Sequence, residues 1–130
     1  TQVNSAMTKA PVSVAPDVRI FDAYEIMRTW GMRHLPVTDA AGTVVGLLSE
    51  RDILRFMAIQ PGRKASLVSE AMSANPYIVN GSARLADVAQ TMAEQKIGCA
   101  VVVGQNGLNG IFTTTDALKI LARLLRDDDD

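Results

Sequence analysis

The sequence has few of the residues from which most enzyme active sites are built. Its 130 residues include one histidine, His34, and one cysteine, Cys99. There is no cluster with metal-ligand spacing, no P-loop and no nucleophile elbow, so we expect neither an enzyme nor a tightly bound cofactor or metal. A single cysteine cannot form an internal disulfide, which is typical of a reducing compartment. We therefore expect a cytoplasmic protein.

The sequence also lacks a large excess of either charge and any long run of apolar residues. Lys and Arg total 13 and Asp and Glu total 14, for a net charge of −1. This balance excludes the broad basic field that sequence-independent nucleic-acid binding requires. No run of about 18 apolar residues is present, so we expect no membrane span, and the opening residues do not resemble a signal peptide. Hydrophobic residues at 48% and charged residues at 21% are typical of a globular domain.

The dominant feature that is present is an internal repeat. Val3–Met7 returns as Val68–Met72, 65 positions later. Gly46–Asp52 returns as Gly110–Asp116, 64 positions later, so one residue is missing from the turn near 106–107. A repeat of this length is one supersecondary unit copied. The 65-residue offset also relates Pro11 to Pro76, Val14 to Val79, Arg19 to Arg84, Asp22 to Asp87 and Met27 to Met92.

The repeat divides the chain into four segments. We assign a first repeat to 1–60, a linker to 61–67, a second repeat to 68–126 and an acidic tail to 127–130. Each repeat, at about 60 residues, is marginal as an independent domain, so we expect the two to fold together. Four aspartates at a helix C-terminus oppose the helix dipole, and we expect the tail to be solvated and the helix end to fray.

Hydrophobic periodicity predicts the order β-α-β-β-α twice, an α+β fold. The leading residues 1–10 are expected to be polar and mobile, and Asp17 is a candidate helix cap. The non-alternating apolar run at 99–103 predicts a strand buried on both faces. The first repeat is predicted to have strands at 12–14, 35–37 and 44–48, with helices at 19–30 and from Ser49 onward. The second is predicted to have strands at 77–79, 99–103 and 109–112, with helices at 84–95 and 115–126.

This order, with Leu35-Pro36-Val37 after the first helix and Gly-x-x-Ser/Thr-x-x-Asp before the second, resembles the CBS-domain pair, or Bateman module. The resemblance covers the chain from Val3 to about Leu125. It implies two repeats packed with pseudo-two-fold symmetry, and two clefts between them that bind adenine nucleotides in a regulatory or sensor role. Candidate ligands are AMP, ADP, ATP, NAD and S-adenosylmethionine, and two modules often form a homodimer. The plain second repeat supports an alternative, a ligand-free dimerisation or interaction module.

The segment Ser49–Asp52 has two interpretations. Ser-x-x-Asp is close to a capping box, in which both side chains satisfy backbone amides at a helix start. The same helix N-terminus also suits a phosphate, and such a carboxylate can accept both hydroxyls of a ribose. The resemblance implies the ribose role for Asp52 and Asp116, with Ser49 and Thr113 or Thr115 near phosphate.

The two copies differ in their basic residues. Arg51 in the first copy corresponds to Thr115 in the second, and Arg33-His34 corresponds to Gly98-Cys99. The resemblance implies that basic side chains at these positions face phosphates, which they bind by charge-assisted hydrogen bonds. The alternative is that they are solvated surface charges. On the first interpretation, the chain has one strong phosphate site and one weaker site.

An adenine ring needs a flat apolar slot. The resemblance implies that the short first strand of the opposite repeat supplies it. For the Asp52 cleft the candidates are then Tyr77 and Ile78, and for the Asp116 cleft the strand 10–14, which includes Val12. Ordinary strand packing is the alternative for all of these residues.

Overall fold

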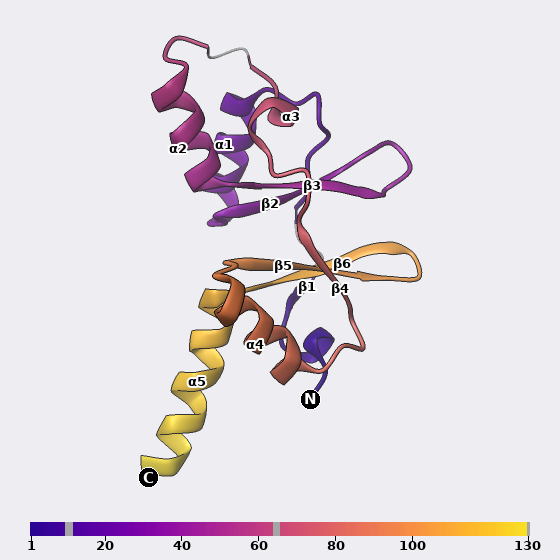
Figure 1. The fold of residues 1–130 in the computed structure, drawn as a ribbon, viewed down its shortest axis with the longest axis vertical. Coiled ribbons are helices and arrows are strands. Elements are labelled where there is room, and N and C mark those ends of the chain that lie inside the picture. The colour runs from indigo at the N-terminus through magenta and orange to yellow at the C-terminus, as the bar shows by residue number, and fades with distance from the viewer. Residues whose placement is uncertain (10–11, 64–65, 130) are drawn as a thin grey trace. The chain divides into compact units, whose positions relative to one another are not determined.

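The protein is described by a computed structural model that covers residues 1–9, 12–63 and 66–129 (Figure 1). Ala10 and Pro11 of the predicted adenine strand, residues 64–65 of the predicted linker and Asp130 of the predicted tail lie outside the described residues. No helix among the described residues is long and apolar enough to cross a membrane.

The chain forms two compact bodies that do not coincide with the two sequence repeats. Val12–Pro76 forms one, which we name the α1–α2 body. Thr1–Pro11 and Tyr77–Asp130 form the other, which we name the α4–α5 body. Each contains helices and strands, which confirms the predicted α+β class. The first residues of the chain therefore belong to a body made mainly from the second repeat.

The described residues of the α1–α2 body form three helices and a two-stranded antiparallel sheet. The helix α1 ends at Gly31, whose φ of 66° is left-handed and suits a glycine. Asp39 closes the turn between the strands by accepting two backbone N–H groups. The elements are α1 (Ile20–Trp30), β2 (His34–Thr38), β3 (Val44–Ser49), α2 (Glu50–Ile59) and α3 (Val68–Ala71).

Two sequence predictions for this body are wrong. The strand expected at 12–14 is reduced to a single bridge at Val14, which pairs in parallel with Val37. An extension toward Val12 would need an N–H from Pro36 of β2, which proline lacks, so the ladder does not extend before Val14. Asp17 does not cap α1, because the N-cap is Arg19 and makes no side-chain cap bond. The Ile20 N–H donates instead to the Ser66 carbonyl oxygen at 2.8 Å, so a distant backbone group replaces the expected cap.

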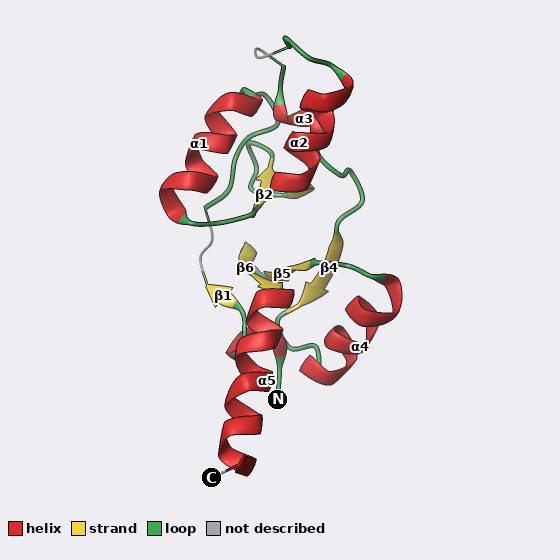
Figure 2. Ribbon diagram, turned by 90° about the vertical axis from the view of Figure 1, so that its left-hand side faces the viewer, coloured by secondary structure: helices red, strands yellow, loops and turns green. Residues whose placement is uncertain are grey.

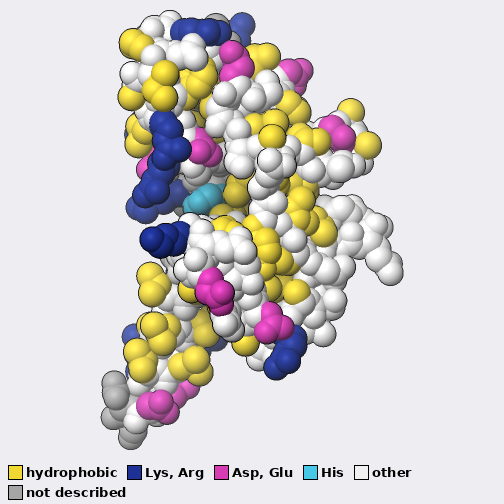
Figure 3. All heavy atoms as spheres, in the orientation of Figure 1, with side chains coloured by type: hydrophobic (Ala, Val, Ile, Leu, Met, Phe, Trp, Pro, Cys, Tyr) yellow, Lys and Arg dark blue, Asp and Glu magenta, His cyan; other side chains and the backbone are white. Residues whose placement is uncertain are grey.

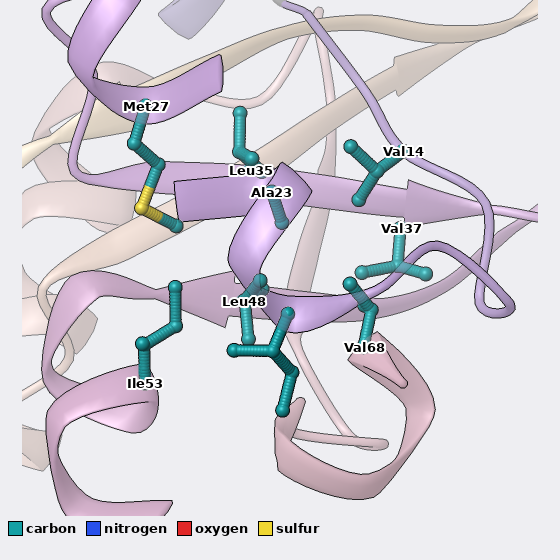
Figure 4. Close-up of a cluster of buried hydrophobic side chains, with 9 residues drawn as sticks. Val14, Ala23, Met27, Leu35, Val37, Leu48, Ile53 and Val68 are labelled. Atoms are coloured by element: carbon teal, nitrogen blue, oxygen red, sulfur yellow. The ribbon is translucent and has the colours of Figure 1, made fainter. Parts of the chain in front are cut away.

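Every helix and strand of this body contributes apolar side chains to its core. Figure 4 shows apolar side chains from α1, the sheet, α2 and α3 pointing toward one another. Full burial of one such side chain contributes roughly 1.5–3 kcal/mol relative to exposure. The buried residues are Val14, Ile20, Ala23, Met27, Leu35, Val37, Leu48, Ile53 and Val68.

The α4–α5 body has a four-stranded sheet with the order β1-β6-β5-β4 (Figure 2). The strands β4 and β5 pair in parallel, while the β5–β6 and β1–β6 pairs are antiparallel. Its elements among the described residues are η1 (Val3–Ser5), β1 (Thr8–Lys9), β4 (Tyr77–Asn80), α4 (Leu85–Gln95), β5 (Cys99–Gly104), β6 (Gly107–Thr113) and α5 (Thr114–Asp129).

The expectation of a mobile leader at 1–10 is wrong for the described residues 1–9. They form a 3-10 turn, η1 (Val3–Ser5), and β1 (Thr8–Lys9), which pairs with β6. Val3 is fully buried with Val88, Met92 and Phe112. The corresponding segment of the second repeat, α3, is buried in the α1–α2 body through Val68. Each repeat thus contributes its leader to the body built mainly from the other repeat.

In each repeated motif, the glycine allows a leader segment to pass close to the strand: the segment at Thr8 passes Gly110, and the segment at Ser73 passes Gly46. A Cβ on Gly110 would lie 2.5 Å from the Thr8 carbonyl oxygen, and one on Gly46 would lie 2.8 Å from the Ser73 carbonyl oxygen. Contacts this short are not tolerated by ordinary side chains, so glycine is required where the leader crosses the strand.

The remaining predictions for the second half have mixed outcomes. Burial of β5 on both faces is confirmed, since Cys99–Val102 are all buried. The predicted end of the last helix is wrong, because α5 continues to Asp129 and does not stop at Arg126.

Candidate functional site

The turn from β3 into α2 carries the first candidate site. Ser49 is the N-cap of α2, and its hydroxyl accepts a hydrogen bond from the Asp52 N–H at 3.0 Å. The Asp52 carboxylate accepts the Ser49 N–H through Oδ2 at 2.9 Å. These bonds form a complete capping box, which satisfies two backbone donors at the helix start. The capping interpretation is confirmed, and Asp52 Oδ1 has no hydrogen-bond donor among the described residues.

Arginine and histidine side chains surround this turn. The Arg33 carbonyl oxygen accepts the Glu50 N–H at 2.9 Å, which places Arg33 beside the start of α2. His34 lies directly opposite Ser49 in the β2–β3 ladder. Arg51 is in the first turn of the helix and, like Arg33, is exposed. Figure 3 shows Lys and Arg side chains grouped along one side of this body. The first copy therefore gathers its predicted hydroxyl, carboxylate and basic groups at one helix N-terminus.

His34 differs from the two arginines in its charge. Burial lowers the pKa of His34 from its ordinary value of 6.5, because the imidazolium loses hydration. The Asp52 carboxylate acts in the opposite direction, and the Arg33 guanidinium adds to the lowering of this pKa. His34 is therefore neutral at pH 7 and offers a hydrogen bond rather than a fixed charge. Arg33 and Arg51 carry the positive charge at this turn.

The turn from β6 into α5 repeats the backbone arrangement with different side chains. The Thr113 N–H donates to Asp116 Oδ2 at 3.0 Å, and the Thr113 hydroxyl accepts the Asp116 N–H at 3.2 Å. The Gly98 carbonyl oxygen accepts the Thr114 N–H at 3.1 Å, the same bond that Arg33 makes in the first copy. Thr115, exposed in the first turn of α5, takes the place of an arginine. The second copy therefore has the same turn without counterparts of Arg33 and Arg51, and its nearby basic side chains, Lys119 and Arg123, come from further along α5.

Cys99 occupies the place of His34 in the second copy. It lies opposite Thr113 in the β5–β6 ladder and is buried. Burial, with a smaller contribution from the Asp116 carboxylate, raises the pKa of the Cys99 thiol to about 12. At neutral pH the thiol is therefore protonated, which fits a small apolar core residue rather than a nucleophile.

The predicted adenine-slot residues are distributed over both bodies. Tyr77 and Ile78 lie on β4 of the α4–α5 body, where Tyr77 is half-buried against the core and Ile78 is 43% exposed. Val12 is half-buried against the core of the α1–α2 body. Which strand faces which capping turn stays a prediction.

Sequence reasoning missed Thr8, which belongs to the second candidate site. Its hydroxyl donates to Asp116 Oδ1 at 3.2 Å, with a longer contact of 3.4 Å to Oδ2. The signal that could have revealed it is the repeat itself, which aligns Thr8 with Ser73 in the stretch before each first strand. Within residues 1–9, 12–63 and 66–129, no group of three or more His, Cys, Asp and Glu side chains could hold a metal ion.

Comparison with known proteins identifies the same family in both repeats of the chain. The CBS domain family model matches residues 3–59 and again residues 68–123. The chain is 31% identical over 116 residues to the CBS domain-containing protein YhcV of Bacillus subtilis, covering 89% of the chain and 82% of that protein. It is 32% identical over 117 residues to inosine-5'-monophosphate dehydrogenase of Aquifex aeolicus, but there the match covers only 23% of the longer enzyme.

Solved structures show the same fold. The chain superposes on CBSX2 in complex with AMP with a TM-score of 0.80 at 27% identity, covering 95% of the chain and 97% of that structure. It superposes on the CBS domain pair of protein MJ0100, solved with 5'-methylthioadenosine and S-adenosyl-L-methionine, with a TM-score of 0.85. That match is 24% identical and covers 94% of the chain and 96% of that structure.

Proposed function

Because this chain belongs to the CBS-domain family, we propose that it is a regulatory module that binds a small molecule containing adenosine. The capping turns at Ser49–Asp52 and Thr113–Asp116 are the proposed contact points for ribose and phosphate. The complexes of CBSX2 with AMP and of MJ0100 with 5'-methylthioadenosine and S-adenosyl-L-methionine support this ligand class. AMP, ADP, ATP, NAD and S-adenosylmethionine are the candidates. The chain itself is proposed to sense such a ligand and not to transform it.

The single observation that carries the proposal is the state of the Asp52 carboxylate. One of its oxygens completes the capping box, and the other has no hydrogen-bond donor among the described residues. A carboxylate that is fixed by its helix and still has an open oxygen is prepared to accept ribose hydroxyls. Packing alone does not require this oxygen to stay open.

The groups around Asp52 suit a phosphate. The Arg51 N–H, in the first turn of α2, makes no hydrogen bond within the described part of the chain. The positive end of the helix dipole favours an anion at that point. The Arg33 and Arg51 guanidinium groups can add charge-assisted hydrogen bonds. The first copy is therefore the proposed phosphate site, and the second is proposed to be weaker.

Regulation requires more than binding. A bound ligand changes the behaviour of the module only if it binds two arrangements of the protein with unequal affinity. We propose that occupancy of the Asp52 site is passed to a partner in this way.

The test is thermal unfolding in the presence of each candidate ligand. A ligand at about 100 times its dissociation constant stabilises the folded state by roughly 2.7 kcal/mol, so the melting midpoint should rise with at least one adenosine ligand. Asp52→Asn should abolish or strongly reduce this rise. The matched control is Glu25→Gln, which neutralises an exposed acid in the middle of α1. Equal shifts with cytidine nucleotides, or no shift with any ligand, would refute adenosine recognition.

A second candidate function is a ligand-free dimerisation module. The observation that favours it is exposed apolar surface on the helices of both bodies. A groove of about 340 Å³ on the α1–α2 body includes Phe21 and Leu54, which are 58% and 59% exposed. A groove of about 420 Å³ on the α4–α5 body includes Leu118 and Leu121. Surfaces of this kind suit a second copy of the chain, and dimerisation is compatible with ligand binding.

A further inference from the structure

The two motif carboxylates differ in how many hydrogen-bond donors they already serve. Asp52 accepts one, the Ser49 N–H. Asp116 accepts three: the Thr113 N–H at 3.0 Å, the Thr113 hydroxyl at 3.1 Å and the Thr8 hydroxyl at 3.2 Å. These counts cover the described residues. Because a carboxylate has about four acceptor positions, Asp52 has room for both hydroxyls of a ribose, whereas Asp116 has room for one.

Thr8 is the donor that makes this difference, and its position is fixed by backbone contacts. It lies on β1 opposite Ile111 of β6, and its carbonyl oxygen crosses Gly110 closely. A β-branched side chain has restricted χ1 freedom, so the hydroxyl is held near the carboxylate. The residue equivalent to Thr8 beside the Asp52 turn is Ser73, which comes from the second repeat and pairs with Leu47 in the same way. The Ser73 hydroxyl makes no hydrogen bond to Asp52 among the described residues.

We propose that Thr8 is a specificity-determining residue that competes with a ribose diol for the Asp116 carboxylate. This inference rests on the proposed function, since it concerns the same ligand class. A ribose can use both oxygens of Asp116 only after the Thr8 hydroxyl turns away. The lost bond to a charged acceptor weakens binding at Asp116 by about tenfold. The first copy is therefore filled first for a reason independent of its arginines.

The experiment is isothermal titration of adenosine and AMP into the wild-type protein and into Thr8→Val. Valine keeps the shape of threonine and removes the hydroxyl, and position 8 is exposed, so the fold should be retained. We expect Thr8→Val to tighten the weaker binding event about tenfold and to leave the tighter one unchanged. The matched control, Ser73→Ala, removes the equivalent hydroxyl beside the Asp52 turn and should change neither event. Thr8→Ala serves as a second variant if the valine protein has an altered melting midpoint.

A second ligand separates ribose recognition from other effects. The gain in Thr8→Val should disappear with 2'-deoxyadenosine, which lacks one hydroxyl of the diol. Wild-type binding with no change in Thr8→Val overturns the inference and leaves the proposed function standing. A gain that is equally large for 2'-deoxyadenosine also overturns it. Absence of binding in both proteins overturns the proposed function and this inference with it.

Discussion

The backbone N–H of Val3 donates a hydrogen bond to the Ala83 carbonyl oxygen at 2.9 Å, joining the start of the chain to its second repeat. The Val3 side chain is 0% exposed and packs in the core of the α4–α5 body. The second repeat therefore does not complete its own core. It needs the first residues of the first repeat, and the first repeat needs Val68 in the same way.

The leader should therefore contribute to stability as a core element. Val3→Ala removes two buried methyl groups and is expected to lower the free energy of unfolding by about 2 kcal/mol. Urea unfolding followed by circular dichroism measures the change. Val68→Ala, at the equivalent position, should have a similar effect, whereas Ile59→Ala, at a 71% exposed site outside both apolar grooves, should change stability by less than about 0.5 kcal/mol. A Val3→Ala protein as stable as the wild type would contradict burial of the leader.

The basic groups of the first copy should matter for phosphate and not for the nucleoside. Arg51→Ala is expected to weaken ATP or ADP binding about tenfold, because a charge-assisted hydrogen bond is lost, and to leave adenosine binding nearly unchanged. Calorimetric titration compares the two ligands directly. Arg55→Ala removes an equally exposed arginine on the same helix and is the control for general electrostatic attraction. Equal losses for ATP and adenosine would exclude a phosphate role for Arg51.

Burial of neutral His34 should make stability depend on pH. Its folded-state pKa lies below the ordinary value of 6.5, so on acidification the unfolded chain binds this proton before the folded protein does. The free energy of unfolding should therefore fall as the pH decreases through about 6.5, and His34 should have no effect well above it. Urea unfolding between about pH 5.5 and 7.5 tests the sign. His34→Gln should flatten the dependence, because the chain has no other histidine. A wild-type protein that becomes more stable on acidification in this range would contradict the assignment.

The apolar groove on the α1–α2 body predicts self-association. Phe21→Glu places a charge among the groove residues, and a charge is costly to bury at an interface. If two copies pair through this face, light scattering should give roughly twice the 14.0 kDa chain mass for the wild type and the chain mass for the variant. Thr29→Glu, exposed on the same helix outside the groove lining, should not change the mass. A monomeric wild type would exclude this face as a stable dimer interface.

Predictions from the sequence succeeded where the interacting residues are close together in the chain. The capping box joins Ser49 to Asp52, three residues apart, and the end of α1 at Gly31 depends on one backbone conformation. Both copies of the motif could be located from the offset of the repeat, because each motif consists of residues that are close together in the chain. Two of the wrong predictions involve distant partners: the leader packs with residues of the second repeat, and the first N–H of the helix that Asp17 was expected to cap donates to Ser66.

The sequence by itself determined the α-β-β-α order within both repeats, the two capping turns and the absence of basic residues from the second turn. Only the tertiary structure decided that each leader joins the body made mainly from the other repeat. The reason is that Val3 and Val68 gain stability from apolar partners far along the chain, which no local pattern specifies. The same placement brings the Thr8 hydroxyl within hydrogen-bond distance of the Asp116 carboxylate. Asp52 Oδ1 has no such donor among the described residues.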